Sequence, residues 1–174
     1  MLGEWRFPHA EQLLANAVTI APAIDALKKR CRDVGVPVVY VNDNHGRWRS
    51  DFRKVVQDAC DREGLGGQIG RLLVPHDNDY FVLKPKHSGF YATPLELLLR
   101  HLHVGNLILT GVSVEHCVTM TATDARMRDF KVWCPEDAVA SQDLGLRDRT
   151  LAQLSETLQV CTDASTKLRL PDLG

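Results

Sequence analysis

The chain has 174 residues, of which 44% are hydrophobic and 25% are charged, and its net charge at pH 7 is −1. This composition fits one compact domain over residues 1–174, and it lacks the basic clusters that bind nucleic acid or anionic membranes. No apolar run approaches the roughly 20 residues that span a bilayer. The five cysteines are odd in number and widely spaced, which predicts reduced thiols in a cytoplasmic protein rather than disulfides or a zinc site.

Helix and strand patterns alternate along the first half of the chain. Apolar residues at helical spacing predict a helix over residues 9–34, in which Pro22 favours a kink or a break. The β-branched run "VPVVYV" (36–41) is typical of a buried parallel strand. After the polar loop "NDNHGRWRSDF", a helix is predicted over 53–62, and the glycines of "EGLGGQIG" are expected to end it.

The alternation continues to the end of the chain. Thr93, Pro94 and Glu96 form a capping-box pattern at a helix start. The whole pattern predicts a three-layer α/β domain with a mostly parallel sheet. The other predicted elements are strands over 80–84, 106–112, 131–135 and 159–163, helices over 115–129 and 143–158, and a loop at "DAVAS".

Cys117 and Lys84 are the candidate reactive pair, because sites in such sheets form at the carboxyl ends of the strands. Cys117 begins a helix after the strand "NLILTGV", and Lys84 ends the strand "YFVLK". Free N–H groups at a helix start and a nearby ammonium both favour a thiolate. The alternative is that Cys117 is a small core residue and Lys84 a solvated strand end.

Two segments carry a resemblance to a known family. "VLKPKHSGFYATPLELLLR" and "NLILTGVSVEHCVTMTATDARMRDFKVWCPEDAVAS" are similar to the isochorismatase-like cysteine hydrolases, which include nicotinamidases and N-carbamoylsarcosine amidohydrolases. The resemblance covers nearly the whole chain, including "VPVVYVNDNHGRWRSDF". It implies a Rossmann-like fold whose strand order resembles 3-2-1-4-5-6.

Residue roles follow from the resemblance by position. Cys117 matches the nucleophile and Lys84 the catalytic lysine. A cis peptide is implied at Val112–Ser113, where it would direct the Ser113 and Cys117 amides to one oxyanion site. The implied reaction is hydrolysis of a C–N bond in a small molecule through a covalent thioester. Vinyl-ether hydrolysis of the isochorismate type fits poorly, because enzymes of that branch lack the cysteine.

The chain departs from the family at its amino end. Relatives have a first, interior strand that ends in a general-base aspartate, and in this chain both would precede Met1. The resemblance therefore predicts an N-terminally incomplete domain, in which 36–41 and 106–112 lack a neighbour and the chain is unstable, rearranges or gains a strand from elsewhere. Asp43 is the best local replacement for the base, although the turn formers of "NDNHG" favour an aspartate bonded to its own backbone.

The remaining expectations concern ligands and partners. Asp43, Arg47, Trp48 and Phe90 are candidate substrate contacts, while Trp48 could equally anchor a solvated loop. Asp43 and His45 have no convincing third ligand, so no metal or other cofactor is expected, and a nicotinamidase is disfavoured. A small-molecule substrate and a homo-oligomer are expected. The alternative function is a catalytically silent or truncated member that acts as a binding protein or subunit.

Overall fold

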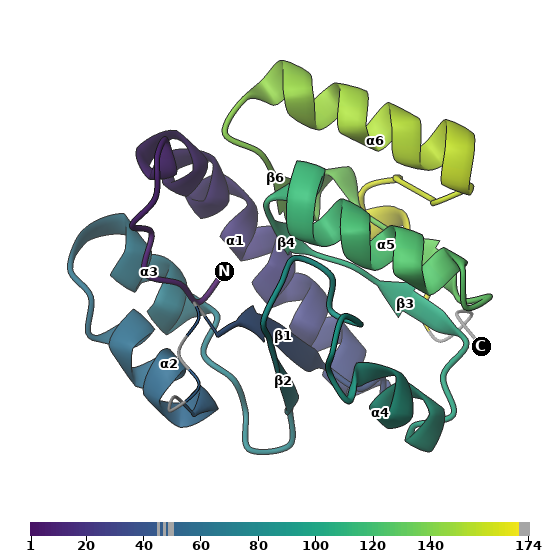
Figure 1. The fold of residues 1–174 in the computed structure, drawn as a ribbon, viewed down its shortest axis with the longest axis horizontal. Coiled ribbons are helices and arrows are strands. Elements are labelled where there is room, and N and C mark those ends of the chain that lie inside the picture. The colour runs from purple at the N-terminus through teal and green to yellow at the C-terminus, as the bar shows by residue number, and fades with distance from the viewer. Residues whose placement is uncertain (45, 47, 49–50, 171–174) are drawn as a thin grey trace.

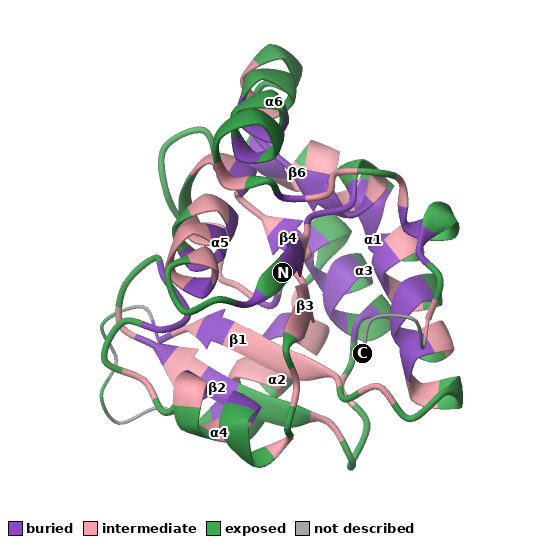
Figure 2. Ribbon diagram, turned by 90° about the vertical axis from the view of Figure 1, so that its right-hand side faces the viewer, coloured by how far each residue is buried: buried purple, intermediate pink, exposed green. Residues whose placement is uncertain are grey.

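The computed structural model describes residues 1–44, 46, 48 and 51–170. Its strands lie between helices, with α5 on one side and α1 and α3 on the other (Figure 1 and Figure 2). All strand pairs in the described residues are parallel, which confirms the predicted α/β class.

The helices are α1 (Ala10–Asp33), α2 (Phe52–Cys60), α3 (Gly64–Leu72), α4 (Leu95–His101), α5 (Thr119–Arg126) and α6 (Leu144–Leu158). The strands are β1 (Val39–Asp43), β2 (Tyr80–Lys84), β3 (Asn106–Ile108), β4 (Gly111–Val112), β5 (Lys131–Trp133) and β6 (Val139–Ala140).

The strands form three parallel pairs, β1 with β2, β3 with β5 and β4 with β6. No ladder joins these pairs within the described residues, so the strand order 3-2-1-4-5-6 stays a prediction. The first two residues lie between β1 and β4. The Asn42 side-chain amide donates to the Leu2 carbonyl over 2.7 Å, and a Cβ at Gly111 would lie 3.3 Å from the Met1 Cγ.

The long first helix agrees with its predicted range, and it continues through Pro22 without a break. Its apolar face packs on α3 and on the β4–β6 pair, and Ala17, Ile20 and Ile24 lie in that part of the core. Figure 2 shows this buried face turned toward the strands. No helix in the described part of the chain has both the length and the apolar character needed to cross a bilayer.

The glycine-rich segment after α2 is a helix, which corrects the prediction that its glycines end one. A Cβ at Gly67 would lie 1.7 Å from the Arg62 carbonyl oxygen, and one at Gly70 would lie 2.5 Å from the Ala59 carbonyl oxygen. These glycines therefore let α3 approach the backbone at the end of α2 closely. Close packing outweighs the helix-breaking tendency of glycine here.

Four further predictions are corrected by the structure. The run 106–112 is divided into β3 and β4, and the loop "DAVAS" contains β6, a two-residue strand buried against β4. The last predicted strand reduces to one bridge between Cys161 and Trp133. Thr93 Oγ1 accepts from the Leu95 N–H over 3.2 Å, but Glu96 pairs with Arg100 and Arg128 rather than completing the capping box.

Candidate active site

Asp43 and Lys84 meet at the carboxyl ends of two neighbouring strands. The parallel register pairs Asp43 of β1 directly with Lys84 of β2, so both side chains leave the same face of the sheet. The Lys84 Nζ lies 3.2 Å from the Asp43 Oδ2. Asp43 therefore does more than form a turn, because its carboxylate also contacts the Lys84 ammonium.

Cys117 lies in the turn that directly precedes α5. Residues Val114–Val118 form a π-helical turn that runs directly into α5, so the thiol lies near the start of a longer helical segment. The hydroxyl of Thr121, one turn later, donates to the Cys117 carbonyl over 2.6 Å. The Cys117 Sγ is partly buried and lies 3.5 Å from the Lys84 Nζ.

The Lys84 ammonium is the centre of this arrangement. Its residue is 4% exposed, so the charge has lost most of its contact with solvent. Three acceptors surround the Nζ, namely the Asp43 Oδ2, the Cys117 Sγ and, at 3.0 Å, the Lys86 carbonyl oxygen. An ammonium has three N–H donors, so this set can occupy all of them. The burial of the charge is thus compensated by hydrogen bonds and by an opposite charge.

The turn before Cys117 has the geometry that the resemblance implies. The Val112–Ser113 peptide bond is cis. The Ser113 carbonyl accepts from the Val118 N–H over 3.3 Å, which closes the π turn around Cys117. The Ser113 Oγ lies 3.0 Å from the His116 Nδ1.

Besides Asp43, the predicted substrate contacts have different environments. Phe90 is 7% exposed, and its ring packs against Phe130 and beneath the Arg128 guanidinium, so it is a core residue rather than a pocket wall. Trp48 is 81% exposed, which contradicts the alternative that it anchors its loop by packing. Arg47 lies outside the described residues, as does His45.

Three of the other four cysteines occupy environments that disfavour a thiolate. Burial raises the pKa of Cys134 to about 12. Burial also raises the pKa of Cys31, although two neighbouring arginines oppose this shift, and it raises the pKa of Cys60, where Asp61 adds to the effect. Of the five free thiols, Cys117 is the one in contact with a lysine ammonium in the described structure.

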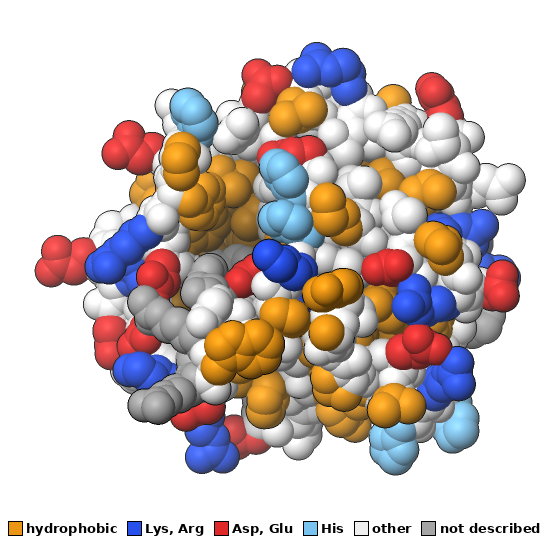
Figure 3. All heavy atoms as spheres, in the orientation of Figure 1, with side chains coloured by type: hydrophobic (Ala, Val, Ile, Leu, Met, Phe, Trp, Pro, Cys, Tyr) orange, Lys and Arg blue, Asp and Glu red, His pale blue; other side chains and the backbone are white. Residues whose placement is uncertain are grey.

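Two histidines lie beside the thiol, and sequence reasoning gave neither a role at the site. The His87 Nδ1 is 3.8 Å from the Cys117 Sγ, and the His87 and His116 rings have centroids 5.4 Å apart. Figure 3 shows histidine side chains gathered next to a hollow lined by hydrophobic side chains. The only signal for His87 in the sequence is its position three residues after Lys84, which by itself does not indicate a contact.

No group of three or more histidine, cysteine, aspartate or glutamate side chains among the described residues is arranged to hold an ion. Asp43, which the sequence offered as one half of a metal pair, lies against Lys84.

Comparison with known proteins links this geometry to a family. The isochorismatase domain model matches residues 4–166. The isochorismatase family protein YaaI of Bacillus subtilis is 38% identical over 141 residues, which cover 81% of this chain and 77% of that protein. Some other curated relatives are longer, and the alignments span 45% and 52% of two of them.

Solved structures share the fold. The structure of N-carbamoylsarcosine amidase from Thermoplasma acidophilum has a TM-score of 0.70 at 25% identity, and the match covers 96% of this chain and 90% of that one. An isochorismatase family protein from Desulfovibrio vulgaris has a TM-score of 0.75 at 22% identity, and covers 93% of this chain and 88% of its own.

Proposed function

The chain belongs to the isochorismatase family of enzymes, and we propose that it hydrolyses an amide-like C–N bond in a small molecule. One observation carries the proposal: the Lys84 Nζ lies 3.5 Å from the Cys117 Sγ and 3.2 Å from the Asp43 Oδ2. The similarity to an N-carbamoylsarcosine amidase supports a C–N bond of an amide or urea-like compound as the target.

Each of the three side chains has a distinct role in the proposed site. Cys117 is the nucleophile, and the buried ammonium of Lys84 stabilises its thiolate form. Asp43 holds that ammonium in place and balances its charge. The carboxylate is 34% exposed, so its pairing with Lys84 matters more for orientation than for stability.

The reaction proceeds through a thioester. The thiolate attacks the carbonyl carbon, an S–C bond forms, and the C–N bond breaks as the amine leaves with a proton. Water then attacks the thioester, which releases the carboxylic acid and restores the thiolate. We assign the oxyanion site to the backbone N–H groups of Ser113 and Cys117 in the turn that begins at Val112. This chemistry uses protein groups and water alone, in a cytoplasmic enzyme whose five cysteines stay reduced.

The substrate is expected to approach from the loop that follows β1. Trp48 exposes 81% of its surface there, five residues beyond Asp43. We propose that Trp48 and Arg47 contact a planar or carboxylate-bearing group of the substrate, through ring stacking and a bidentate guanidinium respectively.

Acetylation of the thiol tests the proposed chemistry without knowledge of the natural substrate. With p-nitrophenyl acetate, the chain is expected to release a burst of nitrophenolate equal to the amount of enzyme. Mass spectrometry should then find the acetyl group on the peptide that contains Cys117. Slow, unselective acetylation of several cysteines would instead support the alternative of a silent member that acts as a binding protein or subunit.

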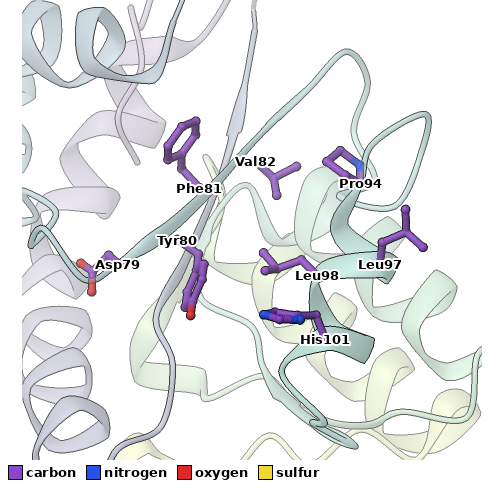
Figure 4. A pocket seen from close by; sticks show the side chains of 8 residues that line it. All are labelled: Asp79, Tyr80, Phe81, Val82, Pro94, Leu97, Leu98 and His101. Atoms are coloured by element: carbon purple, nitrogen blue, oxygen red, sulfur yellow. The ribbon is translucent and has the colours of Figure 1, made fainter.

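A homo-oligomer is the second part of the proposal, and an apolar groove supports it. The groove has a volume of about 480 Å³ and lies between β2 and α4 (Figure 4). β2 pairs with β1 alone among the described strands, so its other edge is open to a second copy of the same strand. Its lining residues are Asp79, Tyr80, Phe81, Val82, Pro94, Leu97, Leu98 and His101.

Leu97→Glu is expected to convert the oligomer to a monomer, because Leu97 is 71% exposed on the rim of this groove and a buried carboxylate would oppose association. Native mass spectrometry or analytical ultracentrifugation measures the change. Leu144→Glu is the matched control, since Leu144 is 60% exposed at the start of α6. A monomeric wild-type chain, or an unchanged mass for Leu97→Glu, would contradict the proposed interface.

A further inference from the structure

Amide hydrolysis at Cys117 needs a group that moves a proton, and the geometry leaves Lys84 poorly placed for it. An amine leaves from a tetrahedral intermediate only when its nitrogen is protonated, because the free amide anion is strongly basic. The three N–H donors of Lys84 face the Asp43 Oδ2, the Lys86 carbonyl and the Cys117 Sγ. Lys84 is also 4% exposed, so it holds the thiolate from the buried side of the site.

His87 approaches the same sulfur from the exposed side. Its Nδ1 lies 3.8 Å from the Cys117 Sγ, and its residue is exposed to solvent. An imidazole can donate and accept a proton near neutral pH, which is the property that both halves of a hydrolysis require. Cys117 therefore lies between a buried ammonium and an exposed imidazole.

The loop that carries His87 is fixed to the helical segment that carries Cys117. The Gly89 N–H donates to the Thr121 Oγ1 over 2.9 Å, and the same hydroxyl donates to the Cys117 carbonyl over 2.6 Å. The Ser88 Oγ bonds the Asp124 carboxylate of α5. These contacts begin one residue after His87, so they connect its loop to the helical segment that carries the thiol.

The His116 ring lies next to the His87 ring. The two rings are tilted by 31° with centroids 5.4 Å apart, and the His116 Nδ1 lies 3.0 Å from the Ser113 Oγ and 3.7 Å from the Glu115 Oε1. The second carboxylate oxygen of Glu115 is buried without a hydrogen-bond partner in the described structure.

We propose that His87 is the acid and base of the reaction at Cys117, an inference that rests on the proposed hydrolase function. In the first half, the S–C bond forms, the C–N bond breaks, and the His87 imidazolium gives its proton to the leaving nitrogen. In the second half, neutral His87 takes a proton from water while the oxygen attacks the thioester. The S–C bond then breaks, the carboxylic acid leaves, and the thiolate and imidazolium are restored.

The two phases of p-nitrophenyl acetate hydrolysis separate this role from that of the thiolate. Nitrophenolate leaves without a proton, so His87→Gln should keep the burst rate within about 3-fold of wild type. Hydrolysis of the acetyl thioester needs a base, so steady-state turnover should fall by about 100-fold and acetylated Cys117 should accumulate. His76→Gln, in an exposed loop, is the matched control and should leave both phases unchanged.

Four outcomes would count against the inference or against the function on which it rests. Steady-state turnover of His87→Gln equal to wild type would overturn it, while the burst would still support Cys117 as the nucleophile. A variant in which burst and turnover fall by the same factor, or in which iodoacetamide labels Cys117 more than about 10-fold slower, would make His87 a partner of the thiolate instead. A wild-type chain without a burst would overturn the proposed function itself.

Discussion

Cys117→Ala is expected to lower hydrolysis of p-nitrophenyl acetate and of any amide substrate by about 10³-fold or more, because the proposed covalent step requires the sulfur. No other described thiol can take its place, since Cys117 alone contacts a lysine ammonium within the described structure. The burst of nitrophenolate should disappear together with the acetylated peptide. Stopped-flow absorbance and mass spectrometry measure the two effects.

Cys161→Ala is the control for this loss. Cys161 is also partly buried, and it lies at the far end of the chain beside β5. Its removal should leave the burst and turnover within about 2-fold of wild type. If Cys117→Ala retained the burst, the sulfur would not be the nucleophile, and the assignment of the site would be wrong.

Lys84→Met is expected to slow the alkylation of Cys117 by iodoacetamide about 10- to 100-fold at neutral pH. The substitution keeps much of the side-chain volume but removes the positive charge that lies 3.5 Å from the sulfur, and only the thiolate reacts. It also leaves the Asp43 carboxylate without this ion pair at the end of β1. The alkylation rate is read from mass spectra of the Cys117 peptide over time.

Two further variants test whether the loss of the positive charge causes the slower alkylation. Lys131→Met makes the same change at the exposed start of β5 and should leave the alkylation rate unchanged. Lys84→Arg restores a positive charge in a larger side chain and should recover part of the rate. A Lys84→Met variant that unfolds at the wild-type temperature yet alkylates as fast as wild type would exclude the proposed role of Lys84.

The central pair of the site could be predicted from the sequence because each residue depends on a local segment. Cys117 follows a strand and begins a helix, and Lys84 ends a strand. Sites in parallel sheets form at the carboxyl ends of the strands, so both residues are expected at the same edge of the sheet. The contact between Asp43 and Lys84 could not be predicted from either segment alone. It depends on the register that pairs the last residues of β1 and β2, which no single segment encodes.

Other features were missed because they depend on packing between distant segments. The glycines of α3 look like helix breakers until the backbone of Arg62 and Ala59 is seen against them. β6 consists of Val139 and Ala140, too few residues for a pattern, and it exists because β4 lies beside it. His87 is an ordinary loop residue in the sequence, and its position follows from bonds between its loop and α5.

Competitive labelling of the wild-type thiols tests the central claim most directly. A short pulse of iodoacetamide at neutral pH, followed by mass spectrometry of the peptides that contain Cys31, Cys60, Cys117, Cys134 and Cys161, gives five relative rates. We expect Cys117 to react at least about 10-fold faster than each of the others, because the Lys84 ammonium lies 3.5 Å from its sulfur and a nearby positive charge favours a thiolate. Equal rates, or a faster reaction at Cys60 or Cys161, would contradict a thiolate nucleophile at residue 117.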